Sequence, residues 1–225
     1  MQRLFKTILP AMALLALGFQ PAASAERALR ILALGDSLTE GYGLAPGADF
    51  PNQLEQALKA RGLNVQLINA GVSGDTSAGG LARLDWSLGD AKNAPDAAIV
   101  ELGANDGLRG LAPAEMEKNL DAILTKLKLR NVAVLLTGMK SPRNFGAAYA
   151  AEFDAVFPRL AKKYNVLFDR FFLEGVALDR TLLQPDGLHP NPKGVEVIVK
   201  RIAPLVVQLA QQAQAKRSAP RPSTP

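Results

Sequence analysis

The sequence predicts an α/β fold of three layers, in which a five-stranded parallel sheet lies between two layers of helices. Short apolar runs alternate with segments of helical periodicity along the chain, and this alternation is typical of a parallel sheet covered on both faces. Glycines and polar residues gather where the apolar runs end. Because ligands of such sheets bind beyond the carboxyl ends of the strands, we expect the functional site there.

The predicted strands are short apolar runs, as expected of strands that are buried on both faces. They span Leu29–Leu34, Val65–Ile68, Ala97–Leu102, Val132–Thr137 and Val166–Phe168. The predicted helices span Gln53–Ala60, Ser77–Leu88, Glu115–Leu129, Ala147–Tyr164 and Lys193–Gln214. The third helix has the clearest apolar face and has Pro113 near its start, where proline is favoured. Pro204 is expected to kink the last helix.

Size and charge favour a single globular domain, which we place at residues 26–215. The chain has 225 residues, enough for a sizeable core, and its 48% hydrophobic and 21% charged residues are ordinary for a soluble protein. The net charge of +5 is matched by five basic residues near the two ends, which are Arg3, Lys6, Lys216, Arg217 and Arg221. The body of the chain is therefore neutral, which argues against a nucleic-acid partner.

The two ends are expected to lie outside this domain. Residues 1–25 resemble a signal peptide, because basic Arg3 and Lys6 precede an apolar run and Ala23–Ala25 suits cleavage. The run falls short of the ~20 residues that a membrane span needs. We expect a bacterial periplasmic or secreted monomer with no membrane segment after cleavage. It has no disulfides because the chain has no cysteine. Residues 216–225, rich in Pro and Ser, are expected to form a disordered tail.

Four polar clusters follow predicted strands. They are Gly35-Asp36-Ser37-Leu38, Asn69–Ser77 (NAGVSGDTS), Glu101–Gly107 (ELGANDG) and Asp186–Asn191 (DGLHPN). The last cluster holds His189, the only histidine of the chain. A lone histidine is more often structural, but Pro190 keeps this one in an irregular turn. There the Asp186 carboxylate can bond to one ring nitrogen, which is the orienter–base half of a nucleophilic triad.

Ser37 is the candidate nucleophile. A serine at a strand-to-helix turn is also a common helix N-cap, so the two interpretations compete. The G-x-S-x-G elbow of the α/β-hydrolases is absent, because Thr39 stands two residues after Ser37. This absence argues against an α/β-hydrolase and leaves other classes of serine hydrolase open.

The four clusters, in this order, resemble the four blocks of the SGNH (GDSL) hydrolase family. The stretches GDSLTEGYG, NAGVSGDTSAGGLARL, VELGANDGLRG and DGLHPN are similar to its bacterial periplasmic thioesterase/lysophospholipase and arylesterase branch. The similarity covers roughly Leu29 to Leu209. It implies a flavodoxin-like α/β/α fold and a serine esterase that hydrolyses aryl esters, acyl-CoA and lysophospholipids. The implied reaction passes through an acyl-serine intermediate and needs no cofactor.

The resemblance also implies roles for single residues. Ser37 matches the family's nucleophile, and Asp186 and His189 match its Asp and His. The family's oxyanion hole uses two backbone N–H groups and an asparagine amide, which match Ser37, Gly74 and Asn105. A neutral amide suits this role because it donates without holding a counter-charge in the ground state.

Two further assignments are less direct. Gly71 is a near rival of Gly74, although the SGDT context favours Gly74. Met139, Pro142 and Phe145 follow the fourth predicted strand, where this branch has a substrate-binding loop. They are candidates to line an acyl groove, but apolar loop residues are as often packing.

Three alternative functions are open. One is a carbohydrate deacetylase of the same fold, and another is a non-catalytic binding module. The third is a metal-dependent phosphotransfer protein that uses the carboxylates near the sheet edge, which are those of Asp36, Asp75, Asp106 and Asp186. Asp after a strand commonly caps the next helix, so we expect no metal. We expect Asp36 and Asp106 to support the loops, and a small acyl ester or thioester to be the substrate.

Overall fold

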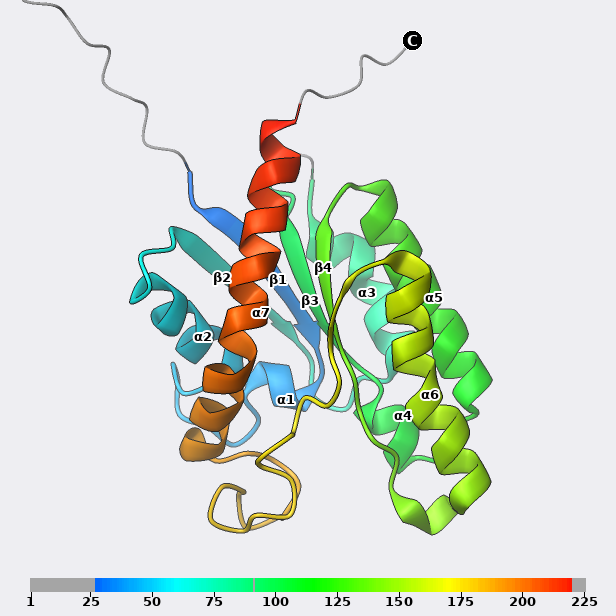
Figure 1. Cartoon of the computed structure of the whole chain (residues 1–225). Helices are drawn as coiled ribbons and strands as arrows, with labels where there is room; N and C mark the ends of the chain where they lie inside the picture. The colour runs from blue at the N-terminus through cyan, green and yellow to red at the C-terminus, as the bar shows by residue number, and fades with distance from the viewer. Residues whose placement is uncertain (1–26, 91, 220–225) are drawn as a thin grey trace, which may run out of the picture.

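Five parallel strands form one sheet in the order β2-β1-β3-β4-β5 (Figure 1). The structure is a computed structural model that describes residues 27–90 and 92–219. The strands are β1 (Leu29–Gly35), β2 (Val65–Gly71), β3 (Ala97–Glu101), β4 (Ala133–Thr137) and β5 (Leu167–Asp169). This order is that of flavodoxin-like folds. The predicted fold class is confirmed, and each predicted strand is present with small shifts at its ends.

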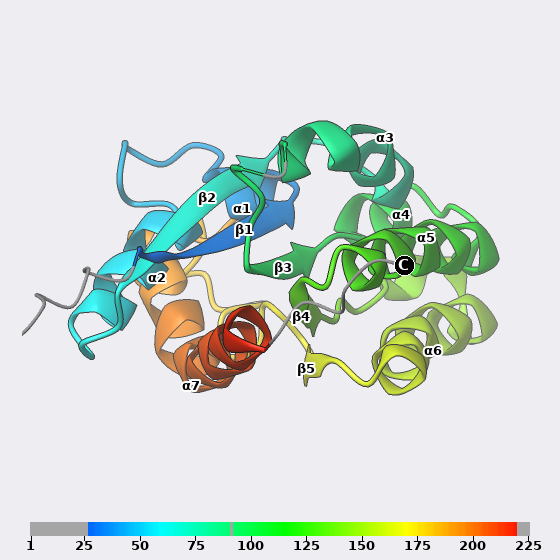
Figure 2. The same ribbon diagram turned by 90° about the horizontal axis from the view of Figure 1, so that it is seen from above.

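Helices cover both faces of the sheet. The long helices are α2 (Phe50–Lys59), α3 (Ser77–Leu88), α5 (Pro113–Leu129), α6 (Ala147–Tyr164) and α7 (Pro192–Ser218). Figure 2 shows α2 and α7 on one face and α3, α5 and α6 on the other. The central strands β1, β3 and β4 are almost fully buried, which explains why their sequences are continuous apolar runs instead of alternating ones.

Short helical segments follow the strands at one end of the sheet. They are α1 (Ser37–Glu40), α4 (Ala104–Leu108) and the 3-10 turn η1 (Arg143–Phe145). The pattern of apolar residues did not predict them, because four or five residues are too few to show helical periodicity. They matter for function, since α1 and α4 carry two of the predicted site residues.

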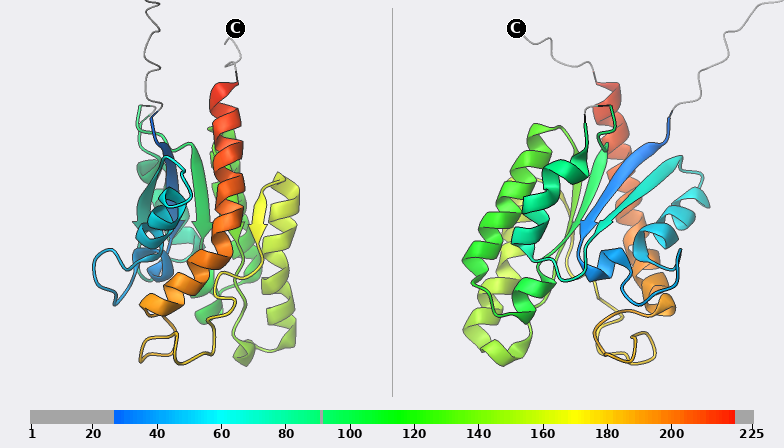
Figure 3. Two further views of the ribbon diagram at one scale, coloured as in Figure 1. Left: turned by 60° about the vertical axis from the view of Figure 1, so that its left-hand side comes forward. Right: turned by 180° about the vertical axis from the view of Figure 1, so that it is seen from behind.

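Helix caps explain two differences from the predicted boundaries. Helix α2 begins at Phe50, three residues before the predicted start, because the Asp49 side chain accepts the backbone N–H of Asn52. Asn191 caps α7 in the same way, and Pro192 occupies the first helical position. Figure 3 shows that α7 changes direction along its length, and Pro204 lies inside it.

The end of α7 corrects part of the predicted tail. The helix continues to Ser218, so the first three residues of the predicted disordered segment 216–225 are helical. The Lys216 amine donates to the Val132 carbonyl at 3.2 Å, which ties this last turn to the start of β4. Residues 220–225 and the predicted signal peptide, residues 1–25, lie outside the described residues. No described helix is both long and apolar enough to cross a membrane.

Candidate active site

Ser37 is the first residue of α1, and only Asp36 separates it from the end of β1. The Asp36 side chain caps this helix by accepting the Leu38 N–H at 3.0 Å. Asp36, and not Ser37, is therefore the N-cap, which removes the main competing interpretation of the serine. As the first residue of α1, Ser37 also has a backbone N–H without an acceptor inside the helix.

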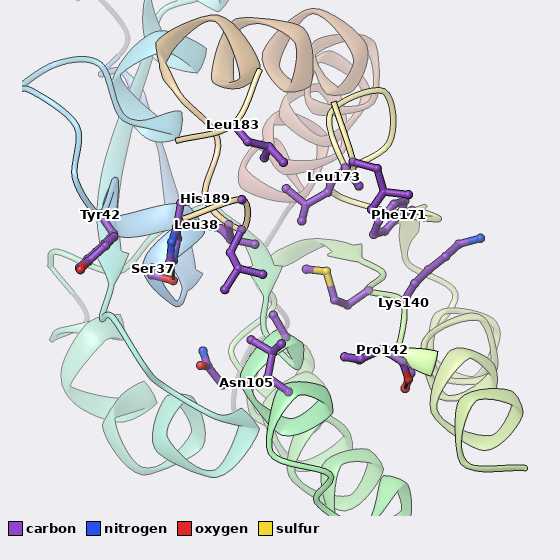
Figure 4. A pocket seen from close by; sticks show the side chains of 18 of the residues that line it. Ser37, Leu38, Tyr42, Asn105, Lys140, Pro142, Phe171, Leu173, Leu183 and His189 are labelled. Carbon is purple, nitrogen blue, oxygen red and sulfur yellow. Dashed lines mark hydrogen bonds between the residues drawn. The ribbon is translucent and has the colours of Figure 1, made fainter. Parts of the chain in front are cut away.

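The three predicted triad residues lie within hydrogen-bonding distance of one another. Ser37 Oγ is 2.8 Å from His189 Nε2, and His189 Nδ1 is 2.7 Å from Asp186 Oδ2. Figure 4 shows the serine and the histidine side by side at one end of a pocket. They come from opposite ends of the chain, and they meet because both segments follow the carboxyl ends of strands at the same edge of the sheet.

The Asp186 carboxylate is held in its ionised form. The Leu188 N–H, at 2.9 Å, and the His189 imidazole and N–H lower the pKa of Asp186 to about 2. An ionised carboxylate can only accept, so it assigns the ring proton to Nδ1 of His189. Nε2 is then the acceptor for the Ser37 hydroxyl, as a general base requires.

Two neighbours that the sequence did not point to hold His189 in place. The Tyr42 ring packs on the imidazole with 4.7 Å between ring centroids. Gln184 donates its backbone N–H to the His189 carbonyl at 2.8 Å and its side-chain amide to the Tyr42 carbonyl at 2.7 Å. The contacts of Tyr42 with His189 and Gln184 join distant segments, which no local pattern identifies, whereas Gln184 lies only five residues before His189.

Gly74, and not its rival Gly71, lines the same pocket as Ser37. Gly74 has a φ of +83°, a conformation that favours glycine, and its carbonyl accepts from Arg109 Nη2 at 2.8 Å. Gly71 ends β2, where a Cβ would meet the backbone nitrogen of Glu40 at 2.1 Å. Close packing therefore accounts for the glycine at position 71.

Asn105 projects from α4 into the site (Figure 4). Its amide nitrogen donates to Asp36 Oδ2 at 3.1 Å and to the Asp75 carbonyl at 2.9 Å. Both hydrogens of the amide are therefore used in this structure. Donation to a substrate oxyanion requires one of these two bonds to be shared or exchanged.

The pocket beside Ser37 has a volume of about 510 Å³ and a largely apolar lining. Met139 and Pro142 line it, and Phe171 and Leu173 lie at the side away from Ser37 (Figure 4). The prediction for Phe145 differs from the structure. Its ring packs against Tyr149, with 5.3 Å between centroids, and does not line the pocket. The reason is that η1 directs this side chain towards α6.

The other carboxylates near the strand ends are engaged in loop contacts. Asp106 accepts from the backbone N–H and the hydroxyl of Ser77 at 2.8 and 2.6 Å, and Asp75 pairs with Arg83 at 2.6 Å. Within the described part of the chain, no three acidic, histidine or cysteine side chains are grouped so that they could hold a metal ion. Asp106 thus supports a loop, as expected.

The sheet order and the hydroxyl–imidazole–carboxylate arrangement at its edge define a class of α/β/α ester hydrolase that lacks the G-x-S-x-G elbow. Residues 33–197 match the model of the GDSL-like Lipase/Acylhydrolase family. The chain belongs to this GDSL, or SGNH, hydrolase family, and it is a serine esterase.

Three similar proteins have esterase names. The "Thioesterase 1/protease 1/lysophospholipase L1" of Escherichia coli is 39% identical over 206 residues, which are 90% of this chain and 95% of that protein. The "Arylesterase" of Vibrio mimicus is 36% identical over 194 residues, covering 86% and 96%. The solved structure of AlinE4, an SGNH-hydrolase family esterase, is 48% identical with a TM-score of 0.70, covering 82% of this chain and 98% of that one.

Proposed function

We propose that this serine esterase cleaves both carboxylic esters and acyl thioesters through an acyl-Ser37 intermediate. The observation that carries the proposal is the continuous chain of contacts Ser37–His189–Asp186, at 2.8 and 2.7 Å. His189 Nε2 takes the hydroxyl proton as Ser37 Oγ attacks the acyl carbonyl, and Asp186 stabilises the imidazolium that forms. The protonated imidazole then gives its proton to the departing alkoxide or thiolate.

The second half of the reaction repeats these roles with water. His189 takes a proton from a water molecule that attacks the acyl carbonyl, and it gives this proton to Ser37 Oγ as the bond from Oγ to the acyl carbon breaks and the carboxylic acid leaves. In both halves the oxyanion receives hydrogen bonds from the Ser37 and Gly74 N–H groups and from the Asn105 amide. Fixed donors at this position stabilise the transition state more than the ground state.

The substrate range follows from the pocket. Its apolar lining holds an acyl chain at ~0.8 kcal/mol per buried CH₂, which discriminates poorly between neighbouring chain lengths. This apolar lining offers few polar groups that could select for a particular leaving group. The names of the relatives, thioesterase, lysophospholipase and arylesterase, support the same breadth.

The experiment is a panel of p-nitrophenyl esters from acetyl to palmitoyl together with acyl-CoA thioesters and a lysophospholipid. We expect hydrolysis of all three classes, with kcat/KM changing gradually along the acyl series and a Ser37→Ala control at background. Hydrolysis of acetyl esters alone, with longer chains inert, would contradict the proposal and favour the sugar deacetylase.

A further inference from the structure

Two buried acidic side chains lie beneath the site and take no part in the triad. Asp36 precedes Ser37, and Glu101 ends the neighbouring strand β3, where it is paired in register with Gly35. Both are fully buried, with 0% exposure. Two carboxyl groups so close together in the interior cannot both be ionised without a large cost in desolvation and repulsion.

The Asp36 carboxylate links the nucleophile to the oxyanion hole. One oxygen accepts the Leu38 N–H at 3.0 Å and thereby caps the helix that carries Ser37. The other accepts the Asn105 amide at 3.1 Å. A neutral acid at this position would lose one of its two acceptor oxygens to the proton, so both contacts favour an ionised Asp36.

Glu101 has the opposite environment. Its Oε2 accepts the Thr39 hydroxyl at 2.8 Å, while its buried Oε1 has no hydrogen-bond partner among the described residues. An ionised oxygen without a partner is strongly disfavoured in a protein interior. Burial and the charge of Asp36 raise the pKa of Glu101 well above its ordinary value. The proton of the pair therefore resides on Glu101.

The environment of Asp36 moves its titration into a range where enzymes are assayed. Burial is the main reason that the pKa of Asp36 is raised to about 6, and the charge of Asp75 raises it as well. The Leu38 N–H, the Asn105 amide and His189 act in the opposite direction. The charged groups around it are thus Glu101 on β3, Asp75 and His189 on loops, and Arg83 on α3. Arg83 bonds to the Gly35 carbonyl at 2.8 Å and to Asp75.

The charge of Asp36 has a direct consequence for Asn105. Both acceptors of the Asn105 amide, Asp36 Oδ2 and the Asp75 carbonyl, would repel the amide oxygen, so they fix the NH₂ group towards them. A hydrogen bond to an ionised acceptor is the stronger of the two. The Asp75 carbonyl is then the partner that yields when an oxyanion forms.

We propose that Asp36 and Glu101 are positioning residues that share one negative charge and one proton, with the proton on Glu101, and that ionised Asp36 holds the Asn105 amide as a donor to the oxyanion. The inference rests on the proposed role of Asn105. When Asp36 is protonated, its hydroxyl becomes a donor, and the Asn105 amide loses the charged acceptor that orients it. Protonation of Asp36 therefore lowers the activity at acid pH.

The test is the slope of log kcat against pH on the acid side, with p-nitrophenyl butyrate as substrate. Protonation of Asp36 adds a loss of about 10-fold near its pKa of about 6, so in the wild-type protein log kcat should fall there more steeply than the slope of 1 that a single essential protonation gives. Asp36→Asn removes this titration, so its slope should nowhere exceed about 1. Asparagine keeps an oxygen for the Leu38 N–H but cannot also accept from Asn105. Its kcat therefore falls by about 10-fold or more at pH 8, with KM changed far less.

Glu101→Gln is the matched control, because glutamine imitates the neutral acid and keeps an acceptor for Thr39. Its acid limb should keep the region steeper than 1 that the wild-type protein shows. The double variant Asp36→Asn/Asn105→Ala should have the same kcat as Asn105→Ala alone, because both substitutions remove the same hydrogen bond between Asp36 and Asn105. Circular dichroism at each pH separates these effects from acid unfolding.

Three outcomes overturn the inference. A wild-type slope of 1 shows that no second group titrates, and this result needs no variant to fold. A slope that nowhere exceeds 1 in Glu101→Gln, with the steeper region kept in Asp36→Asn, places the charge on Glu101. If the losses of kcat in the double variant are fully additive, Asp36 does not act through Asn105. A Ser37→Ala protein that stays active would instead contradict the proposed function itself.

Discussion

The Asp186 carboxylate divides its two oxygens between the backbone and His189. Oδ1 accepts the N–H groups of Leu188 and His189 at 2.9 and 3.1 Å, and Oδ2 lies 2.7 Å from His189 Nδ1. This division leaves one oxygen free to orient the imidazole. It also determines what an amide in the same place would do.

Asp186→Asn is expected to reverse the tautomer of His189. The asparagine oxygen satisfies the two backbone N–H groups, so its NH₂ group faces Nδ1 and makes that nitrogen an acceptor. Nε2 then carries the proton and cannot take another from Ser37. We expect kcat to fall by about 10⁴ with the fold intact. Steady-state kinetics at pH 8 measure it, and a loss below tenfold contradicts the assignment.

The acyl pocket is tested by two residues that the sequence grouped and the structure separates. Met139 lines the pocket, whereas Phe145 packs on Tyr149 outside it. Met139→Ala should lower kcat/KM for long acyl esters more than for acetyl esters, because each lost CH₂ contact is worth ~0.8 kcal/mol. Phe145→Ala should leave the acyl-length profile unchanged. If the two substitutions changed the acyl-length profile equally, the acyl chain would not bind in the pocket lined by Met139.

The buried charge of Asp36 also predicts a dependence of stability on pH. The fold raises its pKa from 3.8 to about 6, so the folded state binds the proton more tightly than the unfolded one. The stability this group contributes is fully present below pH ~4 and is lost as the pH rises through about 6. Asparagine does not titrate, so the Asp36→Asn variant does not lose this stability as the pH rises.

Thermal unfolding of wild type and Asp36→Asn at several pH values checks this expectation. The Tm of the variant relative to wild type should rise steadily between pH ~4 and ~6. The variant would then gain relative stability where it loses activity, which is a trade-off common at functional sites. A Tm difference that is constant across this window contradicts a buried titrating Asp36.

Export is a separate prediction about residues outside the described structure. Cleavage after Ala25 gives a mature protein that begins at Glu26. N-terminal sequencing of protein from the periplasm or medium of an expressing bacterium is the measurement. A chain that retains Met1 in the membrane fraction is the result that would overturn a cleaved signal.

Much of the site could be predicted because parallel strands end at one edge. The positions of Ser37 and Asn105 follow from that rule once β1 and β3 are recognised as strands. His189 and Asp186 could be paired from their spacing and from Pro190. These residues depend on local sequence and on the direction of the strands, and both can be read from the chain.

What could not be predicted depends on contacts across the fold. The packing of Tyr42 on His189 and the bond from Arg109 to the Gly74 carbonyl join segments far apart in sequence. Thr39 looks like an ordinary loop residue, yet it is buried against Glu101. Phe145 was misplaced because an apolar residue in a loop carries no periodicity to show which way it faces.

The central claim, that His189 activates Ser37 as a nucleophile, is tested most directly by a fluorophosphonate probe and mass spectrometry of the labelled peptide. The account predicts an adduct on Ser37 in the wild-type protein, none in Ser37→Ala, and labelling slowed by at least ~10³-fold in His189→Ala, since the chain has no second histidine to replace it. An adduct on Ser73 or Ser77, or fast labelling of Ser37 without His189, would contradict it.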